Sequence, residues 1–198
     1  MSREPLTLAS GSPRRRQLLE MLGIPLRVVP SNVPEIHRPA ETALDYVERL
    51  AREKALSVPG RLVLGADTTV IVRDEILEKP VDEADALRML LKLQGRTHQV
   101  MTSVALVAGG QVHQATDVTN VGFRRMGEDY LRAYVATGEP MDKAGAYGIQ
   151  GYGAALVERI EGDFFSVMGL PVRLVLRLME QAGERYEFGG ANASVSSG

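Results

Sequence analysis

The chain has 198 residues, 44% of them hydrophobic and 24% charged, with a formal net charge of −2 and no cysteine. This composition is ordinary for a soluble globular protein and excludes disulfides, thiolate zinc sites, iron–sulfur clusters and a cysteine nucleophile. The small negative charge argues against a general nucleic-acid coat, and without a signal peptide or a run of roughly 20 apolar residues we expect a cytoplasmic protein that binds no membrane.

The first part of the chain alternates short strands with helices. In chain order, apolar spacing and turn residues predict a strand at 6–9, a helix at 13–22 closed by Gly23, a strand at 24–29, a proline-rich loop at 31–39, an amphipathic helix at 42–57, and a strand at 61–65 that runs to Asp67 and resumes at 69–72.

The second part contains a long hairpin between helices. It is predicted as a turn at 73–75, a helix at 83–93, strands at 97–107 and 111–124 joined at Gly109-Gly110, a helix at 128–136, a glycine-rich loop at 142–153, a strand at 154–160 and a helix at 170–182. This mixture predicts an α/β fold with a mixed sheet in one domain, residues 1–187. Residues 188–198 have the composition of a disordered tail.

The stretch LASGSPRRRQLL places three cations at a predicted helix start. Ser12 is the expected N-cap and Pro13 the first helical residue, followed by Arg14, Arg15 and Arg16. A helix N-terminus is already positive, so a purely solvated arginine face is the poorer interpretation. A bound anion such as phosphate resolves the conflict. Because the three side chains cannot share one direction, we expect one of them to be a surface spectator.

Asp67 follows a buried strand, at the edge of the sheet where ligands collect in α/β folds. An Asx-turn or N-cap carboxylate is the alternative interpretation. Lys54, Lys79 and Glu35 could reach the same region. Carboxylates with lysine and arginine around a polyphosphate are what metal-assisted phosphoryl transfer requires.

The remaining polar signals are weaker. His98 and His113 fall in predicted strands and are expected to be structural or surface residues, whereas His37 in the proline-rich loop is a candidate ligand. The three histidines form no spaced metal cluster. The glycines around Gln150 mark either a connector or a backbone that approaches a flat ligand closely.

Five separated motifs in the same order resemble the Maf family of nucleotide pyrophosphatases. They are LASGSPRRRQLLEMLGI, EIHRPAETALDYVERLAREKA, LVLGADTTVIV, EKPVDEADALRMLLKLQGRTHQVMTSVAL, and DKAGAYGIQGYGA with IEGDFFSVMGLPV. The resemblance implies a curved mixed sheet in two lobes with a nucleotide cleft between them. It also implies hydrolysis of a nucleoside triphosphate between the α- and β-phosphates, giving the monophosphate and pyrophosphate, with a divalent cation, Mg²⁺ or Mn²⁺, as cofactor.

The resemblance also assigns roles to residues. Asp67 matches the catalytic aspartate, and with Glu35 it is expected to hold the metal. Positions associated with substrate choice are matched by Arg14, Thr68 and Gln150. Polar residues of the phosphate and metal site are matched by Ser10, Arg15, Glu35, Lys54 and Lys79. The motifs around Asp67-Thr68, QVMT and GIQGYG are similar to the branch that acts on dTTP and UTP. Glu78 stands where the family usually has glycine, which adds a negative charge beside Lys79.

Gln150 supports a hypothesis for how the base is read. An amide can pair with the N3–H and a carbonyl of uracil or thymine, provided that something holds it in one orientation. We expect the backbone around Gly148, Gly151 and Gly153 to do so, with the Thr68 hydroxyl adding a contact.

Two other functions stay open. The chain could hydrolyse a modified or purine nucleotide on the same fold, or it could be a nucleotide-binding regulator of cell division without turnover. The joint presence of Asp67, Glu35, Lys54 and Lys79 weighs against the regulator. The expected partner is a small-molecule nucleoside triphosphate rather than nucleic acid, and a homodimer is an alternative to a monomer.

Overall fold

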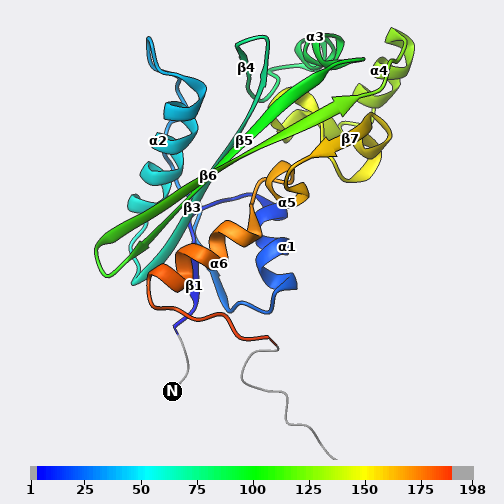
Figure 1. The fold of residues 1–198 in the computed structure, drawn as a ribbon. Helices are drawn as coiled ribbons and strands as arrows, with labels where there is room; N and C mark the ends of the chain where they lie inside the picture. The colour runs from blue at the N-terminus through cyan, green and yellow to red at the C-terminus, as the bar shows by residue number, and fades with distance from the viewer. Residues whose placement is uncertain (1–3, 189–198) are drawn as a thin grey trace, which may run out of the picture.

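The computed structural model describes residues 4–188 and shows an open, seven-stranded mixed sheet flanked by six α-helices (Figure 1). Its strands are β1 (Leu6–Leu8), β2 (Leu26–Val28), β3 (Leu62–Val72), β4 (Glu75–Leu77), β5 (Thr97–Ala108), β6 (Gln111–Phe123) and β7 (Val157–Glu161). Its α-helices are α1 (Pro13–Met21), α2 (Ala43–Leu56), α3 (Glu83–Leu93), α4 (Glu128–Val135), α5 (Phe164–Val167) and α6 (Val172–Gln181). The predicted α/β class and mixed sheet are confirmed.

The sheet has a gap along one edge of β3. The strand order is β2-β1-β3-β5-β6-β7, and β4 also pairs with β3. β1 pairs with the beginning of β3, as far as Leu64, whereas β4 pairs with its end, from Val70 onward. Since β5 occupies the opposite edge throughout, residues 66–69 of β3 have no described strand partner on this side. A crevice at such a gap is a common place for a ligand in α/β sheets.

Two separate hydrophobic clusters make the fold two-lobed. The first cluster contains Ala66 and Val104 of the sheet, packed with buried leucines of α1 and α6. The second cluster contains Val70 and Val100, packed with α3 and α4. Ala66 pairs with Val104 and Val70 with Val100, and because side chains alternate along a strand, both pairs lie on the same face of the sheet. The boundary between the two clusters lies at the position between these two pairs.

The other face of β3 is covered by α2. Gly65 lies so close to this helix that an added Cβ would overlap the backbone carbonyl of Ala51. This close approach brings the buried end of α2, including Lys54, against the stretch of β3 that contains Asp67. In Figure 1, α2 lies along one side of the sheet, apart from α1 and α6.

Local signals predicted most elements, and the differences are instructive. α3 has the predicted bounds, and α1 ends as expected, with Gly23 at a φ of 69° just beyond its C-cap. β3 runs without the predicted interruption because β5 pairs with it through that stretch. The strand predicted at 24–29 shortens to β2, and the one predicted at 154–160 starts only at Val157, because Gly151–Ala155 forms a 3-10 helix.

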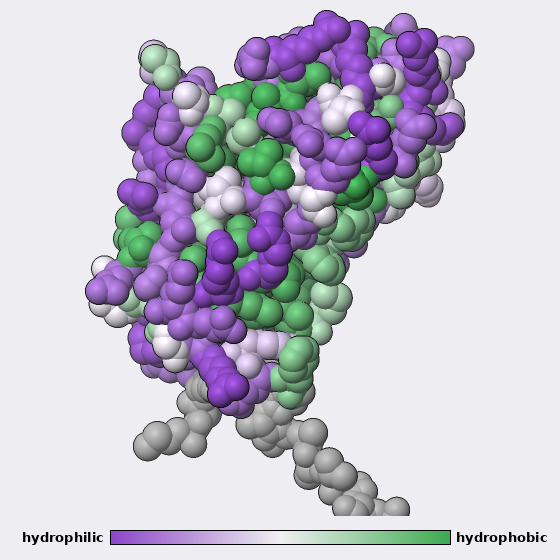
Figure 2. Space-filling view, viewed as in Figure 1, coloured by the Kyte–Doolittle hydropathy of each residue, from purple (hydrophilic) through white to green (hydrophobic). Residues whose placement is uncertain are grey.

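Two short elements, β4 and α5, were not predicted. They have three and four residues and depend on packing against other parts of the fold rather than on a local pattern. The predicted tail at 188–198 lies outside the described residues except for Phe188. No helix among the described residues is long and apolar enough to cross a membrane. On the face drawn in Figure 2, hydrophilic side chains cover most of the surface and hydrophobic ones lie between them in separate patches.

Candidate active site

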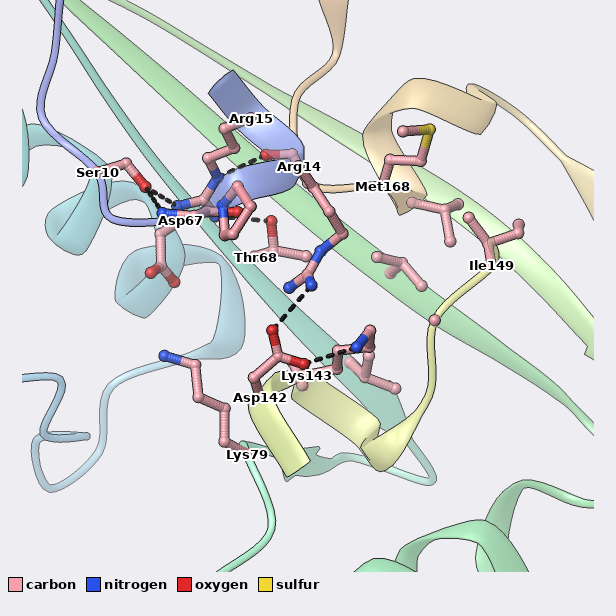
Figure 3. A pocket seen from close by; sticks show the side chains of 18 of the residues that line it. Ser10, Arg14, Arg15, Asp67, Thr68, Lys79, Asp142, Lys143, Ile149 and Met168 are labelled. Atoms are coloured by element: carbon pink, nitrogen blue, oxygen red, sulfur yellow. Dashed lines mark hydrogen bonds and ion pairs between the residues drawn. The ribbon is translucent and has the colours of Figure 1, made fainter. Parts of the chain in front are cut away.

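A cavity of about 560 Å³ opens at the gap beside β3 (Figure 3). Its walls come from the β1–α1 loop, the start of α1, the proline-rich loop, β3 and residues 139–151. Neighbouring residues of a strand point to opposite faces, yet Asp67 and Thr68 both line the cavity. The unpaired edge explains this, because there the cavity reaches both faces of the strand. The volume suits a small organic ligand.

One end of the cavity holds a cluster of two carboxylates and two lysines. The Nζ of Lys54 donates to Glu35 Oε1 at 2.5 Å and to Asp67 Oδ1 at 2.6 Å. The Nζ of Lys79 donates to the other oxygen of Glu35 at 3.0 Å. Lys54 and Asp67 are buried, whereas the Lys79 side chain is 56% exposed. Two carboxylates that share one ammonium must lie close together.

Burial and charge act differently on the two carboxyl groups. Burial raises the pKa of Asp67, and the positive charges of Lys54 and Arg15 oppose that shift. Burial alone would also raise the pKa of Glu35, but hydrogen bonds and charge from Lys54 and Lys79 lower it to about 2. Asp67 is therefore the more basic of the two groups, as a proton acceptor requires.

Arg15 is fixed by the protein before any ligand binds. Its Nε donates to the carbonyl oxygen of Gly169 at 2.8 Å, its Nη1 to Ser10 Oγ at 3.2 Å, and its Nη2 to Thr68 Oγ1 at 3.2 Å. Two of the five guanidinium N–H groups remain for a ligand. Ser12 occupies the predicted N-cap position, but its side chain forms no cap; its backbone N–H donates to Ser10 Oγ instead.

Arg14 and Arg16 leave the helix start in different directions. Arg14 crosses the cavity and donates to Asp142 Oδ2 at 2.9 Å, and Lys143 contacts the other oxygen of Asp142 at 2.6 Å. Arg16 pairs with Glu20 on the exposed face of α1 and does not line the cavity. It is the spectator that the crowding of the three side chains predicts. Figure 3 shows Arg14 and Asp142 meeting across the opening.

The turn that carries Gln150 is held by a carboxylate. Glu139 accepts hydrogen bonds from the backbone N–H groups of Tyr152 at 2.8 Å and Gly153 at 2.9 Å. Gly153 in turn packs so tightly that an added Cβ would overlap the carbonyl oxygen of Gly148. Gln150 itself is exposed and lines the cavity. Close packing at Gly153 and the hydrogen bonds to Glu139 therefore hold the backbone of this turn. That this backbone orients the Gln150 amide stays a prediction.

The residues that the resemblance assigned to the site all line this one cavity. They are Ser10, Arg14, Arg15, Glu35, Lys54, Asp67, Thr68, Lys79 and Gln150. The sequence did not indicate Glu139, Asp142 and Lys143, which line it too. Nothing in the sequence marked Glu139 and Asp142 as site residues other than their position at or near the start of the glycine-rich loop.

The histidines and Glu78 lie away from this chemistry. His37 is exposed and contacts the carbonyl oxygen of Glu41 at 2.9 Å, outside the cavity. His98 is buried next to the second hydrophobic cluster, and its Nε2 lies 2.7 Å from the Tyr147 hydroxyl oxygen. The Glu78 carboxylate accepts from the Tyr46 hydroxyl at 2.7 Å, so the adjacent Lys79 is free to turn toward Glu35.

The donor set fits a metal that phosphate helps to ligate. Residues 4–188 contain no group of three or more histidine, aspartate or glutamate side chains that could hold an ion alone. Glu35 and Asp67 supply two converging carboxylates. Mg²⁺ typically takes one or two carboxylates and completes its shell with phosphate oxygens and water.

The comparisons with known proteins show the family of the chain. The model of the family described as Maf-like protein matches residues 5–182. A dTTP/UTP pyrophosphatase of Symbiobacterium thermophilum is 48% identical over 95% of this chain and 99% of its own. Enzymes with the same name from Alcanivorax borkumensis and Vibrio cholerae are 48% and 49% identical, over 91% and 87% of this chain and 97% and 95% of theirs.

Proposed function

Because the chain belongs to the Maf-like protein family, we propose that it hydrolyses dTTP and UTP between the α- and β-phosphates, releasing the nucleoside monophosphate and pyrophosphate. The observation that carries the proposal is the cavity end where buried Asp67 and Lys54 meet Glu35 beside a preorganised arginine. The identity to relatives named dTTP/UTP pyrophosphatase supports the choice of nucleotide.

The charged end of the cavity suits a triphosphate. Arg15 presents its two remaining N–H groups, and Lys79 adds an exposed ammonium. These cations neutralise phosphate oxygens and absorb negative charge that develops during the reaction. A bound anion also answers why arginines stand at a helix N-terminus, where no first-turn acid offsets them.

Asp67 is suited to accept the proton of the attacking water. Its carboxyl is held in one orientation by Lys54, and burial raises its pKa. Water attacks the α-phosphorus and its proton passes to Asp67. The bond from the α-phosphorus to the oxygen that bridges it to the β-phosphorus breaks, and pyrophosphate leaves with the electron pair of that bond. A divalent cation, Mg²⁺ or Mn²⁺, held by Glu35 and Asp67 would supply charge neutralisation on the phosphates and lower the pKa of water.

The other end of the cavity suits a base. Val100, Val167, Met168 and Ile149 provide apolar walls, and Gln150 offers an amide. A flat pyrimidine can lie against such walls while the NH2 of the Gln150 amide donates to one of its carbonyl groups.

Product analysis tests the proposal. The protein incubated with dTTP and Mg²⁺ should give dTMP and pyrophosphate by chromatography, and accumulation of dTDP and orthophosphate would refute it. Asp67→Asn should still fold, because Lys54 keeps Glu35 as a charged partner, and it should lose at least about a hundredfold in kcat. Asp129→Asn, the same change at an exposed position of α4, is the matched control and should retain full activity.

The same assay addresses the alternatives. A panel of canonical and modified triphosphates at one concentration would reveal a purine or modified substrate as the one turned over fastest. Binding of dTTP without release of any product would instead indicate a nucleotide-binding regulator.

A further inference from the structure

Thr68 faces Thr102 at the point where the two hydrophobic clusters part. The two threonines are paired in register between β3 and β5, on the face that carries both clusters. Thr68 lines the cavity, whereas Thr102 is fully buried behind it and does not. This polar pair therefore lies in the sheet between two apolar pairs. Its hydrogen bonds decide whether the Thr68 hydroxyl acts as a donor or as an acceptor toward a ligand.

The hydrogen-bond partners fix the direction of each hydroxyl proton. Thr102 Oγ1 lies 2.8 Å from the carbonyl oxygen of Ser166, which can only accept, so Thr102 donates its single proton there. Thr68 Oγ1 lies 3.0 Å from Thr102 Oγ1. Since the proton of Thr102 is already committed, Thr68 must donate its own proton to Thr102.

Thr68 is thereby left with acceptor capacity alone. One lone pair accepts from Arg15 Nη2 at 3.2 Å, and the other remains for the cavity. Ionised phosphate oxygens carry no proton and cannot satisfy that lone pair. A ligand group that meets Thr68 must be a donor, such as the N3–H of uracil or thymine. Cytosine places an acceptor at N3 and would set two acceptors against each other.

We propose that Thr102 is a positioning residue for base selection: by taking the proton of Thr68 it keeps that hydroxyl an acceptor, and the site then favours uracil and thymine over cytosine. The proposal rests on the proposed function, because it assigns the ligand at Thr68 as the base of the triphosphate. The apolar walls beside Thr68, including Val100 and Met168, suit a flat ring.

The test compares kcat/KM for UTP, CTP and dUTP in the wild-type protein and in variants. Thr102→Val removes the acceptor for the Thr68 proton, so the hydroxyl can rotate and donate to cytosine. We expect the UTP to CTP ratio, roughly ten to a hundred in the wild type, to fall at least about fivefold, mainly through faster CTP hydrolysis. UTP hydrolysis should change by less than about threefold, since the rotated hydroxyl can still accept.

Two controls separate positioning from simple damage. Thr102→Ser keeps the hydroxyl and should keep the wild-type ratio within about twofold. Thr69→Val makes the same isosteric change at the next position of β3, where the buried Oγ1 has no hydrogen-bond partner among the described residues, and should leave the ratio unchanged. If Thr102→Val does not fold, Thr102→Ala takes its place in the comparison. Alanine removes the same hydroxyl and, unlike valine, puts no methyl group in its position.

The outcomes are distinct. Absence of pyrophosphate release by the wild type from every nucleotide would overturn the proposed function before any variant is made. An equal loss for UTP and CTP in Thr102→Val would show a purely structural role and overturn the inference. A changed ratio of UTP to dUTP, with the ratio of UTP to CTP intact, would show that Thr68 meets the sugar and would overturn it too.

Discussion

Removing the positive charge of Lys54 should destabilise the protein far more than removing that of Lys79. Both ammonium groups contact Glu35, and Lys54 also contacts Asp67. The Lys54 side chain is 6% exposed and that of Asp67 8%, whereas that of Lys79 is 56% exposed. Lys54→Met preserves much of the side-chain volume and leaves Asp67 as a buried carboxylate without its direct partner.

The difference in burial sets the magnitude. Breaking a buried ion pair by removing one partner typically costs about 3–5 kcal/mol, because the other charge stays desolvated. An exposed pair is worth about 0–1 kcal/mol. In a chain of this length, each kcal/mol corresponds to roughly 2–4 °C in Tm. Lys54→Met should therefore lower Tm by roughly 10 °C, and Lys79→Met by less than about 4 °C.

Thermal and urea unfolding of the two variants at pH 8, without nucleotide or divalent cation, would measure this difference. At that pH both carboxyl groups are ionised in the unfolded chain. Equal losses in the two variants, or a loss below about 1 kcal/mol for Lys54→Met, would show that Asp67 does not depend on Lys54. The electrostatic account of the cluster would then be wrong.

Three other changes have defined outcomes. Gly65→Ala should cost about 1–3 kcal/mol or more in urea unfolding, because the added Cβ overlaps backbone of Ala51 rather than a side chain that can move; an unchanged midpoint would contradict that close approach. Burial lowers the pKa of His98 to about 4 from its usual 6.5, so the unfolded chain binds a proton that the fold excludes, and stability should fall by roughly 3 kcal/mol from pH 7 to pH 4. His98→Gln should remove most of that slope, and a slope that persists would assign it to other groups. Glu139→Gln leaves one acceptor atom for two backbone donors of the turn that carries Gln150, so it should weaken the preference for UTP over CTP; an unchanged preference in kcat/KM would mean that the turn does not need Glu139.

Elements with strong local signals were predictable from the sequence. α3 has an aspartate cap, apolar residues at helical spacing and the predicted bounds. The end of α1 was fixed by Gly23, which adopts the positive φ that glycine tolerates. Three adjacent arginines at a helix start indicated a local anion site through electrostatics alone. Asp67 stood out because it follows a buried apolar run.

The resemblance supplied what these local signals could not. Spacing did not say that Lys54, Lys79 and Glu35 would meet Asp67, since each belongs to a different segment of the chain. The resemblance to the Maf family assigned all of them to one site. In the structure the Lys54 ammonium contacts Glu35 and Asp67, and the Glu35 carboxylate contacts both lysines.

Only the tertiary structure decided the remaining parts of the site. Arg14 meets Asp142 across 128 positions of sequence, and Thr68 meets Thr102 across 34. β4 forms because the end of β3 offers it an edge, and the cavity exists because β1 and β4 leave the middle of that edge unpaired. Propensity and periodicity describe neighbours within a few residues. Register, burial and the direction of a hydroxyl proton depend on which distant groups arrive within about 3 Å, and that is settled only when the chain is packed.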